Sequence, residues 1–108
     1  MTVKELSEKT GFTVISAPAP EREVVGAYVG DLLSWVMGRA TADCAWITIM
    51  SNINVIAVAT LTDVACVILS ECVMPDENLI ETANAKGVNL LSSRLTSYET
   101  AISISGIV

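Results

Sequence analysis

The sequence predicts an α/β fold, a single three-layer domain in which a mostly parallel sheet of about five strands has helices on both faces. From Val24 onward, short apolar runs alternate with segments that carry helix start and stop signals. These runs are nearly continuous rather than alternating, which is typical of strands buried on both faces. The chain has 108 residues, 52% of them hydrophobic and 17% charged, which predicts one folded domain rather than a disordered segment.

The N-terminal quarter predicts one helix and two strands. Thr2 and Glu5 have the spacing of a capping box, so we expect a helix to begin there. Phe12–Ser16 is expected as the first strand and Val24–Val29 as the second. The loop between them, Ala17–Glu23, contains two prolines and three charged residues and is too short for a crossover helix. We therefore expect these two strands to be antiparallel or not to be neighbours.

The rest of the chain alternates between helices and strands. Asp31 stands where the N-cap of the next helix is expected, and Thr96 with Glu99 forms a second capping box. The expected elements are a helix from Leu32 to Gly38, a strand at Ala45–Met50, a helix at Val55–Thr62, a strand at Ala65–Ser70, a helix from Pro75 to Gly87, a strand at Val88–Ser92 and a helix from Thr96 toward Gly106.

The segment Cys44–Thr62 has no charged residue and is long enough to raise the question of a membrane span. Asn52 and Asn54 fall near its middle, and two asparagines at bilayer depth would be costly. A strand that ends at Met50 and a helix that starts near Asn54 accommodate the same residues without that cost. We therefore expect no membrane partner.

Composition excludes several classes of function. Twelve acidic and six basic residues give a net charge of −6, which argues against binding nucleic acid or an anionic membrane surface. The N-terminus lacks a signal-peptide core, and Cys44, Cys66 and Cys72 show no metal spacing. We expect all three cysteines to be reduced and buried in a cytoplasmic protein.

Small or polar residues follow each predicted parallel strand. In open parallel sheets, ligands bind outside the carboxyl ends of the strands, where the strand order reverses. These positions therefore predict a shallow pocket for a small polar ligand, although the same residue types also serve as ordinary caps and turns. The strand exits are Gly30-Asp31, Ser51-Asn52 with Asn54, Ser70-Glu71 and Ser92-Ser93.

Catalytic machinery is not indicated. The chain has no histidine, so a Ser-His-Asp arrangement is excluded, and its glycines form no nucleotide-binding motif. Asp31 and Glu71 are the nearest approach to a carboxylate pair and would suit a metal-dependent hydrolase or transferase, the weakest of our three hypotheses. We predict no catalytic residue, no metal ligand and no cofactor. Trp35 and Trp46 are expected as core or interface anchors, and only an exposed Trp35 would suggest ligand stacking.

Four stretches of the chain point to a known family: Glu21–Gly26, Tyr28–Ser34, Ile47–Asn52 and Ala65–Ser70. Together they resemble the DRTGG domain family. Arg22 and Gly26 fit the motif for which the family is named, whereas Glu21 replaces its aspartate, and Glu23 to Val25 replace the threonine region and first glycine. The family is similar to the N-terminal domain of bacterial HPr kinase/phosphorylase, and relatives lie between CBS domains in some pyrophosphatases. The resemblance covers nearly all of residues 1–108.

The resemblance implies a regulatory or assembly domain rather than a catalyst. Our first hypothesis is a cytoplasmic regulatory domain that forms a homodimer and binds a nucleotide or small metabolite. Arg22 would hold an anion or tie down the loop before the second strand, and Gly26 and Gly30 would allow close backbone approach. The second hypothesis is a ligand-free interaction subunit that packs on a larger enzyme. The other residues expected to line the ligand pocket are Asp31, Ser51, Asn52 and Asn54.

Overall fold

The computed structural model describes all 108 residues and confirms the predicted fold class: one five-stranded sheet with helices on both faces. The helices are α1 (Val3–Thr10), α2 (Leu33–Arg39), α3 (Asn54–Thr62), α4 (Glu77–Lys86) and α5 (Ser97–Ile104). The strands are β1 (Thr13–Ser16), β2 (Ala27–Val29), β3 (Ala45–Thr48), β4 (Cys66–Leu69) and β5 (Leu90–Ser92).

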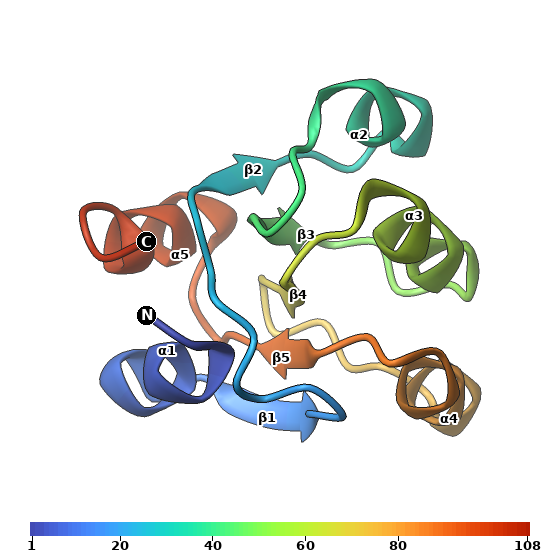
Figure 1. The fold of residues 1–108 in the computed structure, drawn as a ribbon, viewed down its shortest axis with the longest axis horizontal. Helices are drawn as coiled ribbons and strands as arrows, with labels where there is room; N and C mark the ends of the chain where they lie inside the picture. The colour runs from blue at the N-terminus through green and yellow to red at the C-terminus, as the bar shows by residue number, and fades with distance from the viewer.

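The sheet has the order β1-β5-β4-β3-β2. Strands β2 to β5 are parallel, and β1 pairs antiparallel with β5, so β1 and β2 lie at opposite edges and are not neighbours. Helices α2, α3 and α4 cover one face, and α1 and α5 cover the other (Figure 1). This division follows from handedness, because β2 to β5 advance in one direction and right-handed crossovers then place their helices on the same side.

Both faces of the central strands are buried, as the continuous apolar runs predicted. Along β3, Trp46 packs in the core under α2, α3 and α4, whereas Ala45 and Ile47 pack in the core on the opposite face. The neighbouring strand β4 alternates in the same way, with Val67 in the first core and Ile68 in the second. Each strand therefore serves two cores, which leaves it no solvent-facing side for polar residues.

The strands are shorter than predicted. Gly26 adopts a left-handed φ of 75°, which bends the chain so that β2 begins only at Ala27. Strand β3 ends at Thr48 because the next backbone groups bind side chains: the Ile49 N–H donates to Asp31, and the Met50 N–H donates to the Thr48 hydroxyl. Phe12, Ala65 and Val88 likewise precede their strands.

Helix caps were predicted well, with one exception. Capping boxes at Thr2 and Thr96 begin α1 and α5, and Asp76 caps α4, which ends before Gly87. The predicted N-cap at Asp31 is wrong, because α2 begins after Leu32 without a side-chain cap.

The apolar segment Cys44–Thr62 forms β3, a polar turn and α3, as expected. None of the five helices has the length and apolar character needed to cross a lipid bilayer. The expectation of three buried cysteines is wrong for one of them: Cys44 and Cys66 are buried, but Cys72 is exposed in the loop after β4. Burial raises the pKa of both buried thiols, that of Cys66 to about 12.

Candidate functional site

The predicted ligand-binding residues fall into two groups at opposite ends of the sheet. Gly30 and Asp31 follow β2, and the residues after β3 lie beside them, because parallel neighbouring strands end at the same edge. Arg22 and Gly26 precede β2 and lie at the amino ends of the strands. The structure therefore brings together five of the seven predicted residues: Gly30, Asp31, Ser51, Asn52 and Asn54.

Asp31 ties the end of β2 to the end of β3. Its Oδ1 accepts hydrogen bonds from the Thr48 hydroxyl and from the Ile49 N–H, both at 2.9 Å. The neighbouring Gly30 carbonyl accepts a 2.8 Å bond from the indole N–H of the buried Trp46. These bonds hold the carboxyl edge rigidly at β2 and β3.

The polar turn before α3 is also self-contained. The side-chain oxygen of Asn52 accepts a 2.9 Å bond from the Asn54 N–H, so Asn52, not Asn54, satisfies a backbone donor at the helix start. The N-cap residue of α3 is Ile53, which has no side-chain cap. Asn52 and Asn54 are exposed and Ser51 is half-buried, so solvent reaches all three residues.

Arg22 is held by two carboxylates. Its guanidinium donates to the Asp43 carboxylate at 2.9 Å and to the Asp63 carbonyl, and it forms an ion pair with the Asp63 carboxylate at 2.8 Å. Burial opposes the charge on Arg22, but the hydrogen bonds to Asp43 and Asp63 outweigh that effect and raise its pKa. Arg22 therefore ties the loop before β2 to the turns that precede β3 and β4.

The Asp31–Glu71 pair does not form a shared site. Asp31 follows β2 and Glu71 follows β4, with β3 between them, so the strand ends are separated by two inter-strand spacings, about 10 Å. Each carboxylate also has its own partners, and that of Glu71 accepts a 2.7 Å bond from the Ser97 N–H at the start of α5. No group of three or more potential metal ligands occurs in the chain.

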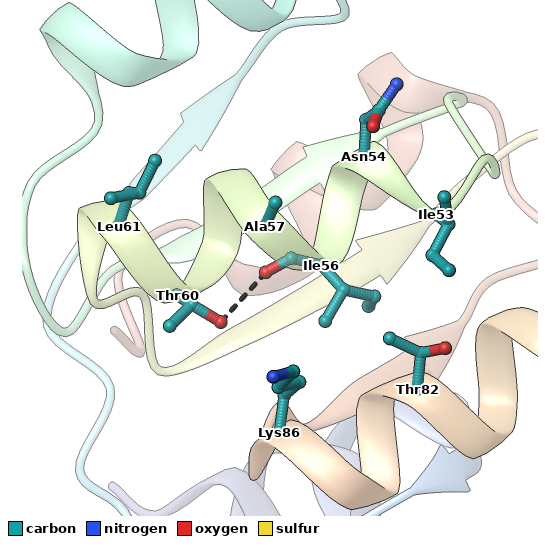
Figure 2. Close-up of a pocket in the computed structure, with 8 residues that line it drawn as sticks. All are labelled: Ile53, Asn54, Ile56, Ala57, Thr60, Leu61, Thr82 and Lys86. Carbon is teal, nitrogen blue, oxygen red and sulfur yellow. Dashed lines mark hydrogen bonds between the residues drawn. The ribbon is translucent and has the colours of Figure 1, made fainter.

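A groove of about 460 Å³ runs between α3 and α4, from Ile53 and Asn54 near the carboxyl ends of the strands to Leu61 and Lys86 near the amino ends (Figure 2). From α3, Ile56 and Thr60 point toward α4, and from α4, Thr82 and Lys86 point toward α3. The Thr60 hydroxyl donates to the Ile56 carbonyl at 2.9 Å, which leaves its oxygen free to accept a hydrogen bond. The lining residues are Ile53, Asn54, Ile56, Ala57, Thr60, Leu61, Thr82 and Lys86.

Lys86 gives this groove its electrostatic character. No carboxylate lines the groove, and Lys86 belongs to none of the three ion pairs in the molecule. The ammonium group therefore lies beside a largely apolar surface without a neutralising partner. Asn54 belongs to both the predicted set and the groove, but Figure 2 shows its amide on the side of α3 away from α4.

Sequence reasoning missed most of this groove because it searched the strand ends. A signal was present in the helices: Thr82 and Lys86 are four residues apart, as are Ile56 and Thr60, so each pair lies on one helix face. Neither pair indicates a site alone, since it is the packing of α3 against α4 that makes the two faces meet.

A smaller polar pocket of about 350 Å³ lies where β5 ends beside the start of β1. Thr13 and Ser92 are cross-strand partners on its wall, and Arg94, which has no ion pair, stands at its rim. Ser92 was among the predicted strand exits, whereas Arg94 was not considered. This pocket has less apolar surface than the groove and offers a ring-shaped ligand less contact area.

Comparison of the sequence with protein-family models and with curated proteins finds no match. Among solved structures, the fold matches that of the CBS and DRTGG domains of the regulatory region of Clostridium perfringens pyrophosphatase, complexed with the activator diadenosine tetraphosphate. The TM-score is 0.74 at 11% sequence identity, and the match covers 95% of this chain but 45% of that chain. The chain therefore shares its fold with part of a regulatory region and spans about half of that region's length.

Proposed function

We propose that residues 1–108 form a non-catalytic regulatory domain of the DRTGG type that self-associates as a homodimer and binds an adenine nucleotide or a similar small anionic metabolite. The observation that carries the ligand-binding part is the α3–α4 groove, whose only charged lining residue is the unpaired Lys86 in a chain of net charge −6. An acidic protein that leaves a cation free in its largest apolar groove is suited to an anionic ligand with an apolar body.

The groove matches a nucleotide in size and chemistry. Its volume lies within the range of about 300–1,000 Å³ that is usual for small-molecule sites. Ile53 and Ile56 offer an apolar surface for a base, and the ammonium group of Lys86 would pair with a phosphate. The likeness to a regulatory region crystallised with diadenosine tetraphosphate supports the proposal. The carboxyl-edge residues Asp31, Ser51 and Asn52 lie outside the lining of this groove.

The test is a calorimetric titration of the protein with ATP, diadenosine tetraphosphate and adenosine. Lys86→Gln is expected to weaken ATP binding about tenfold, since it removes one charge-assisted contact, and to leave the weaker binding of adenosine unchanged. Lys9→Gln, on the exposed side of α1, is the matched control and should bind ATP like the wild type.

Two further variants separate the groove from the carboxyl edge. Thr60→Trp should fill the groove and abolish binding while α3 remains folded, because Thr60 is exposed. The double variant Asn52→Ala with Asn54→Ala, which removes the bond between these residues at the start of α3, tests whether the carboxyl edge also contributes: loss of binding at a cost of about 1–2 kcal/mol in stability would place both asparagines in the site. Full binding by the folded double variant would remove these asparagines from the site, and no binding of any nucleotide by the wild type would refute the proposal.

A second candidate function is a ligand-free interaction subunit that packs on a larger enzyme. It is favoured by large apolar side chains that are exposed on α2 and α3, away from the strand ends: Trp35, Met37 and Leu61. A wild-type protein that binds no nucleotide and remains monomeric would favour this candidate over the regulatory domain.

A further inference from the structure

Strand β2 forms an open edge of the sheet. The Gly26 carbonyl accepts from the Ala45 N–H, and the Gly30 N–H donates to the Ile47 carbonyl, so this side of β2 faces β3. Because backbone groups alternate along a strand, the N–H and C=O groups of Ala27 and Val29 point away from the sheet. Figure 1 shows no other element along the outer side of β2.

Apart from the short length of β2, three residues, the usual protections of an edge strand are missing here. Natural edges carry lysine, proline, inward-pointing charges or bulges that prevent pairing with another chain. From Val24 to Gly38 the only charged residue is Asp31, whose carboxylate is already bound to Thr48 and Ile49. The opposite edge strand, β1, by contrast has a register irregularity between Val14 and Ser16.

Exposed apolar side chains lie next to this edge. Val29 on β2 is 50% exposed, Leu32 is 59% exposed, and Trp35 on α2 is 54% exposed. Arg39 stacks on the Trp35 ring at 3.9 Å from its centroid, so the indole is held in place without being buried. A strand edge with free hydrogen-bonding groups and flanking apolar side chains satisfies both requirements for β-strand pairing.

We infer that β2 is the self-association surface of this protein and pairs with β2 of a second copy, antiparallel about a twofold axis at Tyr28. This inference rests on the proposed function and names the surface for its self-association. Ala27 would lie opposite Val29 of the second copy, and each such pair exchanges two backbone hydrogen bonds. The twofold axis repeats the pair, so one sheet runs continuously through both copies.

Charge favours a second copy as the occupant. Two molecules of net charge −6 repel each other, so they associate most readily through a surface without acidic groups. The outer side of β2 and the exposed face of α2 carry no acidic side chain. Asp31, between them, has its Oδ1 bound to Thr48 and Ile49, and Arg39 at the end of α2 adds a positive charge. In the paired arrangement, Tyr28, Leu32 and Trp35 of the two copies come together on one face of the sheet.

The test is the oligomeric state of Val29→Lys, measured by sedimentation velocity over a range of concentrations. Losing the burial of half a valine in both copies is expected to raise the dimer Kd about thirtyfold, before the repulsion of two lysines is added. Leu61→Lys is the matched control, because Leu61 is 73% exposed on α3, away from β2, and this variant should remain a dimer.

Disulfide trapping tests the same contact without a variant that disrupts the dimer. Tyr28→Cys in a Cys72→Ser background should form an intermolecular disulfide under mild oxidation, because residues opposite each other at a twofold axis lie about 4.5 Å apart at Cα. Leu61→Cys in the same background should not. Rapid and complete crosslinking at Tyr28→Cys alone would support the inference.

Each adverse outcome has a separate meaning. A wild-type dimer that persists in Val29→Lys and fails to crosslink through Tyr28→Cys overturns the β2 surface but leaves self-association intact. A wild-type protein that remains monomeric at a protein concentration of about 100 μM, at which even a dimer of micromolar Kd is largely formed, overturns both the surface and the homodimer. Neither result affects the nucleotide titrations, which test the groove separately.

Discussion

Replacing Arg22 by methionine tests whether this residue is a structural tie or an anion-binding group. Methionine keeps the apolar stem of the arginine and removes its two hydrogen bonds and both ion pairs. Asp43 and Asp63 would then remain close together without a cation, since the Asp43 N–H bonds directly to the Asp63 carbonyl. Both aspartates have left-handed backbone angles, with φ of 67° and 58°, which the tie helps to maintain.

The expected loss is about 2 kcal/mol in the free energy of unfolding. Two ion pairs with half-exposed carboxylates contribute about 0.2–1 kcal/mol each, and the bond to the Asp63 carbonyl contributes about 1 kcal/mol. Side chains that are this exposed do not justify a larger figure. With a typical urea m-value of about 1.5–2 kcal/mol/M, the unfolding midpoint should fall by about 1 M.

Urea unfolding followed by circular dichroism measures this effect. Arg94→Met is the matched control, because Arg94 is exposed and has no ion pair, and its free energy of unfolding should change by less than about 0.5 kcal/mol. If Arg22→Met were as stable as Arg94→Met but bound nucleotides more weakly, the tie would be unimportant and Arg22 would belong to a ligand site.

Two further predictions follow from the ionisable groups. In the native protein a thiol reagent at neutral pH should label Cys72 alone, because burial raises the pKa of Cys66 to about 12, and the urea-unfolded chain should be labelled at all three cysteines. Hydrogen bonds from Thr2, first that of its backbone N–H, lower the pKa of Glu5 below its ordinary 4.5. The stability that Glu5 contributes is therefore present above pH 4.5 and is lost as the pH falls through the pKa of Glu5 in the folded protein. In thermal unfolding measured from about pH 6 to about pH 3, the difference in Tm between the wild type and Glu5→Gln should be smaller at the acid end. A Tm difference that stays constant with pH would contradict this assignment.

The fold was predictable because its determinants are local. Capping boxes at Thr2 and Thr96 and the end signal at Gly87 depend on residues a few positions apart, and the structure contains each of them. Asp31 was misassigned because a cap and a strand-end acceptor have the same local sequence. Only the pairing of β2 with β3 brings Thr48 and the Ile49 N–H within its reach.

The groove was not predictable for the opposite reason. Its two walls, α3 and α4, come from segments separated by β4, and nothing within either segment specifies how closely the helices pack. Lys86 is an exposed lysine on a helix, like Lys4 and Lys9, and its local sequence does not distinguish it from them. The placement of Arg22 depends in the same way on Asp43 and Asp63, which are 21 and 41 residues away in the chain.

Strand order explains why the best ligand groove lies between helices rather than at the strand ends. The helices that follow β4 and β5 lie on opposite faces of the sheet, which is the arrangement that usually opens a binding crevice between two strands. Here the chain fills that position itself. The Glu71 N–H bonds the Leu95 carbonyl, and the Glu71 carboxylate accepts from the Ser97 N–H in the first turn of α5, where a phosphate group would otherwise bind. With this anion position occupied by its own side chain, the fold leaves Lys86, on the helical face, as the cation that faces a groove.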